Sequence, residues 1–155
     1  MNDTAKPSLI IRIPTPIWLF LLIIVAYVAG RLFALPAVYV NRPVGIALII
    51  LGIATSASGR MTFVRQKAEV FPWSEKHSAL VSSGPYRITR NPMYLGLLII
   101  GFGAALLAGT WLMWLVPVTL FVLDNFVIIP FEEASMERAC GDAYREYKRK
   151  VRRWI

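Results

Sequence analysis

The sequence has few of the residues that build disulfides and metal centres. Its one cysteine, Cys140, has no partner for an internal disulfide, and its one histidine, His77, lies far from it in the sequence. A single cysteine without a nearby histidine is a poor metal site, so no metal is expected. His77 stands in a polar stretch and is interpreted as a solvated residue. The sequence also lacks internal repeats and low-complexity tracts, which favours one domain over residues 1–155.

Acidic residues are scarce as well, with 9 Asp and Glu against 17 Lys and Arg. A basic excess is one property of proteins that bind nucleic acid. Here, however, the basic residues lie between and after long apolar runs, a distribution typical of a protein held against anionic lipid. We therefore expect membrane lipids as partners, and neither nucleic acid nor an obligate protein partner.

Charge is missing altogether from several long stretches of a chain that is 57% hydrophobic. The uncharged run from Asn91 to Leu123 is much longer than one crossing of a hydrocarbon core of about 30 Å, at about 1.5 Å per residue. It must therefore fold back, and Gly109-Thr110 is the expected turn. No small-residue cleavage site follows the first apolar run, so we expect that run to be retained as an anchor. The sequence thus predicts an all-α integral membrane protein with four transmembrane helices: Pro16–Leu35, Pro43–Val64, Pro92–Ala108 and Trp111–Phe131.

The distribution of Lys and Arg predicts the orientation of these helices. If both termini lie on one side of the membrane, all of the 17 basic residues except Arg31 and Arg42 fall on that side. The positive-inside rule makes this side cytoplasmic. Both termini and the connection between Arg65 and Arg90, a cytosolic loop, are therefore expected in the cytosol.

The C-terminal segment carries apolar residues three or four positions apart, with basic residues between them. This spacing predicts an amphipathic helix that lies on the membrane with its apolar side down. The residues concerned are Tyr144, Tyr147, Val151 and Trp154.

The third predicted helix is rich in small residues, and two interpretations are open. Small residues let helices approach closely in lipid, which favours plain helix packing. Alternatively, the bare backbone leaves a gap in which a ligand or a lipid tail rests. The residues are Gly96, Gly101, Gly103, Ala104, Ala105, Ala108 and Gly109.

The last two predicted helices bring a basic and aromatic segment to the same membrane face as an acidic pair. The third helix begins at Arg90–Tyr94, and the fourth ends at Glu132-Glu133. In an antiparallel helical hairpin these two ends lie side by side. Two carboxylates at a low-dielectric boundary repel each other unless a cation lies near them. Arg87, Arg90 or a bound cationic ligand would meet this need.

Each of these residues also has a purely structural interpretation. Glu132 or Glu133 complements the dipole of a helix that begins just before them. Arg90 and the boundary tyrosines, Tyr86 and Tyr94, are of the types that fix a span at the membrane surface. Asp124, inside the fourth predicted helix, is a functional candidate because a carboxylate in a membrane is costly, and a structural role is its alternative.

The polar residues of the C-terminal half form ordered motifs. Gly84-Pro85-Tyr86 and Arg90-Asn91-Pro92-Met93-Tyr94-Leu95-Gly96 are followed by Glu132-Glu133, and then by Gly141-x2-Tyr144-x2-Tyr147-x3-Val151-x-Arg153. In this order and spacing they resemble the isoprenylcysteine carboxyl methyltransferase and phospholipid methyltransferase superfamily. Several linked motifs in one membrane frame are more specific than a single short pattern. The resemblance covers about Ala79 to Arg153.

The resemblance implies an S-adenosylmethionine-dependent methyltransferase with a cytosol-facing site and a lipophilic small-molecule or lipid acceptor. Arg90 would orient the acceptor or the cofactor carboxylate, and Glu133 or Asp124 would assist the loss of a proton from an amine acceptor. Arg90 and Glu133 are taken as the catalytic residues. The residues implied to contact the cofactor are Ser78, Ala79, Leu80, Val81, Tyr86, Asn91, Pro92, Met93, Tyr94 and Glu132.

Two positions depart from the prenylcysteine branch of the superfamily. That branch typically has a histidine at the position of Asn91, and an arginine that holds the substrate carboxylate at the position of Ile128. An isoleucine cannot bind a carboxylate, so a free prenylcysteine carboxylate is a doubtful acceptor. A neutral or amine group on a lipid-like molecule fits at least as well.

Two other functions stay open. A membrane reductase of the steroid-reductase type has related core helices and uses NADPH. The chain has no Gly-x-Gly-x-x-Gly fingerprint, but membrane reductases do not require one. A non-catalytic membrane protein whose basic face binds lipid or a partner explains the charge, and leaves the approach of Arg90–Tyr94 to Glu132-Glu133 as a coincidence.

Overall fold

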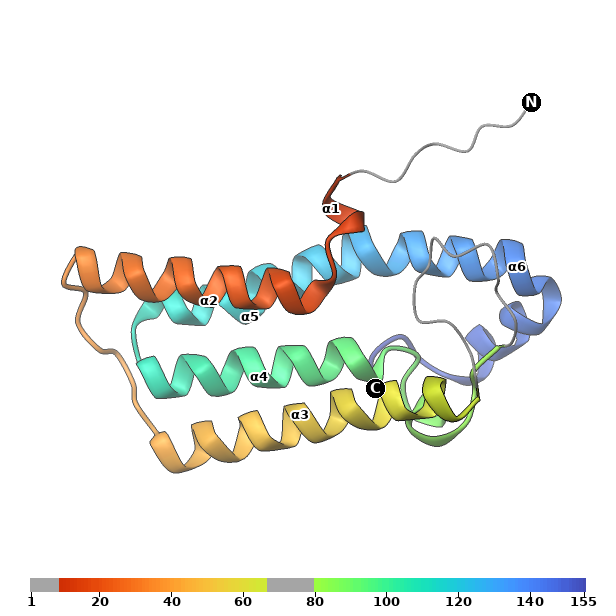
Figure 1. Ribbon diagram of the computed structural model, residues 1–155, viewed down its shortest axis with the longest axis horizontal. Coiled ribbons are helices and arrows are strands. Elements are labelled where there is room, and N and C mark those ends of the chain that lie inside the picture. Colours follow the sequence, from red (N-terminus) through yellow and green to blue (C-terminus); the bar gives the residue numbers. More distant parts are fainter. Residues whose placement is uncertain (1–8, 67–79) are drawn as a thin grey trace.

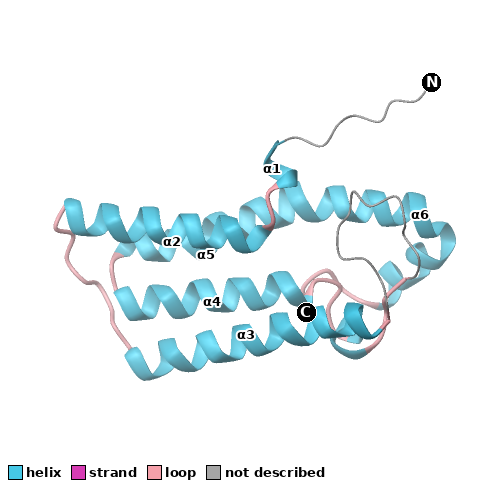
Figure 2. Ribbon diagram, in the orientation of Figure 1, coloured by secondary structure: helices cyan, strands magenta, loops and turns pink. Residues whose placement is uncertain are grey.

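The computed structural model describes residues 9–66 and 80–155, and the described part of the chain is all-α, as predicted (Figure 1). Figure 2 shows helices joined by loops and no strand within the described ranges, where β-structure is limited to isolated bridges between single residues. The elements are α1 (Leu9–Arg12), α2 (Thr15–Leu32), α3 (Arg42–Arg65), the 3₁₀ turn η1 (Gly84–Arg87), α4 (Pro92–Ala108), α5 (Trp111–Leu123), the π-helical segment η2 (Asp124–Ile128) and α6 (Ile129–Lys150).

Four long helices run side by side, with α2 along α5 and α4 between α5 and α3 (Figure 1). We call one end of this bundle the turn end, because it holds the loop 33–41 and the α4–α5 turn. The opposite end, which we call the α6 end, holds η1, the start of α4, α6 and the C-terminus. Segments that are distant in the sequence therefore gather at the α6 end.

The tight turn between α4 and α5 lies at Gly109-Thr110, where it was predicted. Gly109 has a φ of +76°, a left-handed conformation that favours glycine at the end of a helix. Its N–H donates to the carbonyl of Ala105 at 2.8 Å, and its own carbonyl accepts from Val38 at 2.8 Å. A side chain here would collide with the side chain of Val40, so glycine is required, and backbone hydrogen bonds close the turn end.

Three helices of the described part are long and apolar enough to cross a membrane: Thr15–Leu32, Arg42–Arg65 and the continuous rod Trp111–Lys150. The outward faces of α2 and α3 expose large apolar side chains, among them Phe20 and Ile50, which suits contact with lipid. The helices therefore indicate an integral membrane protein. α4 is an apolar helix of 17 residues, and the count of four crossings stays a prediction.

The contact between α3 and α4 is made by glycines. The buried residues of α3 are Gly45, Gly52 and Gly59, spaced a heptad apart. A Cβ atom on Gly52 would lie 2.5 Å from the carbonyl oxygen of Gly96, and one on Gly103 would lie 2.7 Å from the carbonyl oxygen of Gly45. The two backbones touch, so the packing interpretation of the small residues is confirmed. A ligand gap at Gly96 and Gly103 is wrong, since α3 fills that space.

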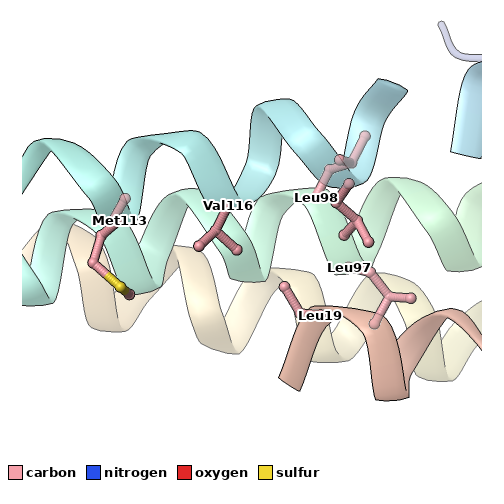
Figure 3. Packing of buried hydrophobic residues seen from close by; sticks show 7 residues of the cluster. Leu19, Leu97, Leu98, Met113 and Val116 are labelled. Carbon is pink, nitrogen blue, oxygen red and sulfur yellow. The ribbon is translucent and has the colours of Figure 1, made fainter. Parts of the chain in front are cut away.

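The hydrophobic core lies between α2, α4 and α5. Figure 3 shows Leu19 of α2 close to Leu97 of α4 and Val116 of α5. Leu120, in the same cluster, is fully buried at 0% exposure. Because lipid is as apolar as leucine, this layer holds the helices together by close van der Waals contact and not by exclusion of water.

One continuous rod runs from the bundle past its α6 end, because α5 passes through η2 directly into α6 (Figure 1). Pro130 follows η2 and has no N–H to donate to the carbonyl four residues earlier, which favours a wider turn at this point. A π-helical turn holds more residues than an α-helical one and rotates everything that follows it. The segment η2 therefore sets the direction in which Glu132 and Glu133 point.

The C-terminal helix is present but differs from the prediction in its course. α6 changes direction at Gly141, whose φ of +53° is a left-handed conformation that favours glycine. The helix ends at Lys150, and Val151 is already extended. Trp154, predicted on the same helix face, therefore lies beyond the helix and packs against the core of the bundle.

The apolar side of this helix packs against protein, so the prediction that this side faces the membrane is wrong, and the placement of the helix at the membrane surface stays a prediction. Tyr144 and Tyr147 are only 5% and 8% exposed, and they form a cluster with Val81 and Tyr86. The sequence spacing correctly predicted one apolar side, but Leu80, Val81 and Tyr86 cover that side.

Candidate active site

The predicted approach of the basic and acidic segments is confirmed at the α6 end. Nη1 of Arg90 lies 3.1 Å from Oε1 of Glu133. The hydroxyl of Tyr94, in the first turn of α4, donates a short hydrogen bond to Oε1 of Glu132. The two segments meet because α4 packs against α5, whose continuation, α6, begins at the same end of the bundle.

Glu133 is the centre of a buried ionic cluster. Arg153 donates from Nε to Oε1 at 3.1 Å and from Nη2 to Oε2 at 2.7 Å. The side chains of Glu133 and Arg90 are only 10% and 11% exposed, so solvent screens their charges weakly. Removing one partner of such a buried pair leaves an uncompensated charge and costs about 3–5 kcal/mol. Both oxygens of Glu133 are thus engaged by the two guanidinium groups.

Glu132 differs from its neighbour in having no such cation. Within residues 9–66 and 80–155, the ion pairs of Arg90 and Arg153 go to Glu133, and no ion pair reaches Glu132. Its hydrogen bond from Tyr94 fixes the carboxylate without neutralising it. Among the described residues, Glu132 is therefore held by a neutral donor, whereas Glu133 is held by two cations.

Asp124 is a third carboxylate in the same region, at the start of η2. It is completely buried, and neither of its oxygens receives a hydrogen bond of standard geometry from the described residues. Thr15 of α2 and Glu132 are its polar neighbours. A buried carboxylate without a partner is costly, and π-helical segments are frequent at functional sites. Both observations favour a functional role for Asp124.

The C-terminal segment returns to this cluster and pairs with the residues before α4. Thr89 forms a parallel bridge with Arg152, and the N–H of Arg90 donates to the carbonyl of Arg152 at 2.9 Å. The carbonyl of Arg153 accepts from Oγ1 of Thr89 at 3.0 Å and from Nδ2 of Asn91 at 2.9 Å. Arg90 is therefore held by its backbone as well as by its side chain.

The predicted cofactor contacts at the start of α4 have structural partners. The side-chain amide of Asn91 donates to the backbone carbonyl of Arg153. Pro92 occupies the first turn of the helix, where a missing N–H costs nothing. The carbonyl of Met93 accepts from Oγ of Ser56 on α3 at 2.9 Å. These contacts fix the helix start, and the contact of Asn91, Pro92 and Met93 with a cofactor stays a prediction.

An aromatic wall borders the ionic cluster. The hydroxyl of Tyr147 donates to the carbonyl of Tyr86 at 2.7 Å, and Phe63 packs edge-on against the Tyr86 ring with centroids 5.3 Å apart. Burial raises the pKa of the Tyr86 phenol far above its usual value, and the nearby Tyr147 and Glu132 raise it further, so the phenol stays protonated. Its buried hydroxyl has no hydrogen-bond partner within the described residues and is free for a ligand.

The four residues of the connection that the resemblance implied are only half described. Val81 is buried in the cluster with Tyr86, and Leu80 packs against it. Ser78 and Ala79 lie outside the described residues.

The sequence did not single out Arg153, Asn125 or Thr15 as neighbours of the acidic pair. Arg153 appeared only as the last residue of the C-terminal motif, and no spacing relates it to Glu133. Its position depends on the reversal at Gly141, which no periodic pattern of apolar residues encodes. Thr15 reaches the site because α2 packs along α5.

Comparison with known proteins identifies the family of the chain. The chain belongs to the phospholipid methyltransferase family, whose profile matches residues 40–143. An uncharacterized protein from Haemophilus influenzae is 43% identical over 63 residues, which is 41% of this chain and 100% of that protein. No solved structure shows a significant match.

The family match defines the class of protein: a methyltransferase whose helices suit a membrane. The matched residues include α3, α4, the rod as far as residue 143 and the acidic pair. The match does not reach α2 or the C-terminal segment that holds Arg153.

Proposed function

We propose that the protein is an integral membrane methyltransferase that uses S-adenosylmethionine and methylates a lipophilic small molecule or a lipid. The observation that supports this most directly is the pairing of Tyr94 with Glu132 beside the Arg90–Glu133–Arg153 cluster. The family match supplies the reaction class. The basic residues gathered at the α6 end favour a cytosolic location for the site, by the positive-inside rule.

The residues present fit such a cofactor. The site holds three carboxyl groups, of Asp124, Glu132 and Glu133, and the guanidinium groups of Arg90 and Arg153 pair with Glu133. Among the described residues no guanidinium group pairs with Glu132, which suits a cationic sulfonium. S-adenosylmethionine, when bound, supplies an electrophilic methyl group on positively charged sulfur.

Glu132 and Tyr86 are the groups with capacity to bind it. Glu132 would hold the amino group or the ribose hydroxyls, because charge-assisted hydrogen bonds to a carboxylate are strong. The unpartnered hydroxyl of Tyr86 would donate to a polar atom of the cofactor, and the faces of the tyrosine rings attract a cation. Tyr94 orients Glu132 for this role.

Arg90 and Glu133, the implied catalytic residues, are best assigned to alignment. Nε of Arg90 donates to none of the described residues, so Arg90 can donate to a carboxylate or an acceptor oxygen while Glu133 holds it in place. Because both oxygens of Glu133 are engaged, it is a poor proton acceptor. For an amine acceptor, Asp124 is the better-placed base.

Methyl transfer is an in-line displacement, so the main tasks of the protein are alignment and the exclusion of water. The rigid start of α4 and the rod provide alignment. A site at the end of an apolar bundle admits a lipophilic acceptor directly from the bilayer. The sequence and structure support this class of acceptor without selecting one molecule.

Calorimetry with purified protein in detergent tests the proposal. We expect S-adenosylmethionine to bind the wild type, and Glu132→Ala to abolish binding while the protein stays folded. Glu146→Ala is the matched control, because Glu146 lies on the same helix and is exposed. Absence of binding to the wild type, or stabilisation by NADPH in place of S-adenosylmethionine in a thermal-shift assay, would overturn the proposal in favour of lipid binding or a reductase.

A further inference from the structure

We propose that residues 152–154 are an integral part of the site and that Arg153 is its principal positioning residue. The proposal rests on the proposed function, and it concerns a segment beyond the family match, which ends at residue 143. Arg153 does not need to touch the cofactor or the acceptor. Its side chain connects η2, which contains Asp124 and Asn125, to Glu133 near the start of α6. Its backbone connects both segments to the start of α4.

The guanidinium group of Arg153 holds two segments at once. Nε and Nη2 bind the two oxygens of Glu133 at 3.1 Å and 2.7 Å. Nη1 donates to the carbonyl and to Oδ1 of Asn125, at 3.1 Å and 3.2 Å. Arginine is suited to such a double contact because its donors point in fixed directions within one plane. A lysine would keep the charge but not this geometry.

The contact with Asn125 stabilises the π-helical segment. A widened turn leaves backbone carbonyls poorly paired, and a buried carbonyl without a donor is costly. Arg153 supplies such a donor to Asn125, and the indole N–H of Trp154 donates to the Asn125 side chain at 3.0 Å. The same two residues therefore stabilise the turn that begins at Asp124.

Holding η2 fixes the direction of Glu132. Successive residues of an α-helix are about 100° apart around its axis, so the loss or displacement of one residue in η2 turns Glu132 away from Tyr94. The Trp154 ring limits such a displacement because it packs on Phe121 of α5, with centroids 5.3 Å apart. Arg153 thus acts on cofactor binding through Glu132, which it does not contact.

The backbone of residues 152 and 153 links the C-terminal segment to the start of α4. The carbonyls of Arg152 and Arg153 accept from Arg90 and Asn91, the two residues before α4. Three regions of the site therefore share one fixed point: the start of α4, the η2 segment and the start of α6.

Two measurements on full-length protein in detergent test the proposal: the dissociation constant for S-adenosylmethionine by calorimetry, and hydrogen exchange at residues 124–128. We expect Arg153→Gln to weaken binding at least about tenfold, as is typical when a residue that orients a binding group is lost, and to speed exchange in η2. Arg153→Lys should fold like the wild type but bind S-adenosylmethionine as weakly as Arg153→Gln. Trp154→Phe keeps the ring but loses the N–H, and should give the same changes to a smaller degree.

Arg149→Gln is the matched control, because Arg149 is an exposed residue of α6 outside residues 152–154 and the change removes the same charge. Equal weakening of binding by Arg149→Gln and Arg153→Gln would reduce the effect to net charge and overturn the proposal. Unchanged binding in Arg153→Lys and Trp154→Phe would also overturn it, even if Arg153→Gln fails to fold. If the wild type itself does not bind the cofactor, the proposed function fails, and exchange at 124–128 alone decides whether Arg153 positions η2.

Discussion

The turn end and the α6 end of the bundle are held together by different kinds of contact. At the turn end, backbone packs on backbone: Gly109 closes a tight turn and pairs with Val38 of the neighbouring loop. At the α6 end, ion pairs between buried guanidinium and carboxylate groups join the segments, and Glu133 lies at their centre. In an apolar environment the first kind of contact is inexpensive and the second is costly.

The difference shows where the fold accepts a cost in stability. Glycine packing along α3 and α4 needs no polar side chain, and Gly52 and Gly96 are in direct contact. A protein that needed only a stable bundle would use such contacts at both ends. The concentration of charge at the α6 end is therefore best explained by ligand binding.

The largest effect is expected at the centre of the ionic cluster. Glu133→Ala leaves the guanidinium groups of Arg90 and Arg153 unpaired, and we expect a loss of about 3–5 kcal/mol in the free energy of unfolding. Unfolding in mixed micelles measures this loss. Glu146→Ala, which removes an exposed carboxylate from the same helix, should change little. A similar small change in both variants would contradict the difference drawn between the two ends.

The next effect is expected along the α3–α4 contact. A Cβ atom on Gly96 would lie 2.5 Å from the carbonyl of Gly52, so Gly96→Ala must push the helices apart at a cost of about 1–3 kcal/mol. Thermal unfolding in detergent measures it. Ala54→Val adds volume to an outward position of α3 and should be tolerated. Equal tolerance of both changes would show that the two helices do not pack this closely.

A pair of glycines with positive φ compares the two ends directly. Gly141 has φ +53° with nothing within 4 Å of an added Cβ, so Gly141→Ala should cost only backbone strain, about 1–2 kcal/mol. Gly109 has φ +76° and a side chain there also meets Val40. Gly109→Ala should therefore lower the melting temperature more than Gly141→Ala. The reverse order would mean that the turn end is the more adaptable one.

The smallest effect on stability, but a clear one on binding, is expected for Tyr94→Phe. The variant loses the hydrogen bond to Glu132 while keeping the ring. We expect S-adenosylmethionine to bind about tenfold more weakly, because hydrogen bonds to charged groups contribute about 1.5–3 kcal/mol. Tyr27→Phe, at an exposed position of α2, is the control. Unchanged affinity in Tyr94→Phe would remove Glu132 from the binding site.

The sequence predicted the helices well because long apolar runs and turn-forming glycines are local signals. The turn at Gly109-Thr110 and the helix Pro92–Ala108 lie where they were predicted. The approach of Arg90–Tyr94 to Glu132-Glu133 was predictable as well, since it follows from the antiparallel order of two neighbouring helices.

The C-terminal segment was not predictable in the same way. Its alternation of apolar and basic residues fits a membrane surface and a protein surface equally well, and only the tertiary fold shows that Tyr144 and Tyr147 pack on Val81 and Tyr86. The contact of Arg153 with Glu133 depends on a single left-handed residue, Gly141, between distant positions. Such a contact has no signature in spacing or composition.

The return of Arg153 to the site also has a consequence for biosynthesis. The helices that precede it are made first, and chains generally begin to fold while they are still being synthesised. Until Arg153 leaves the ribosome, Glu133 lacks its second guanidinium partner and η2 lacks its outer donor. The nascent helices can therefore enter the bilayer before the ionic cluster around Glu133 is complete.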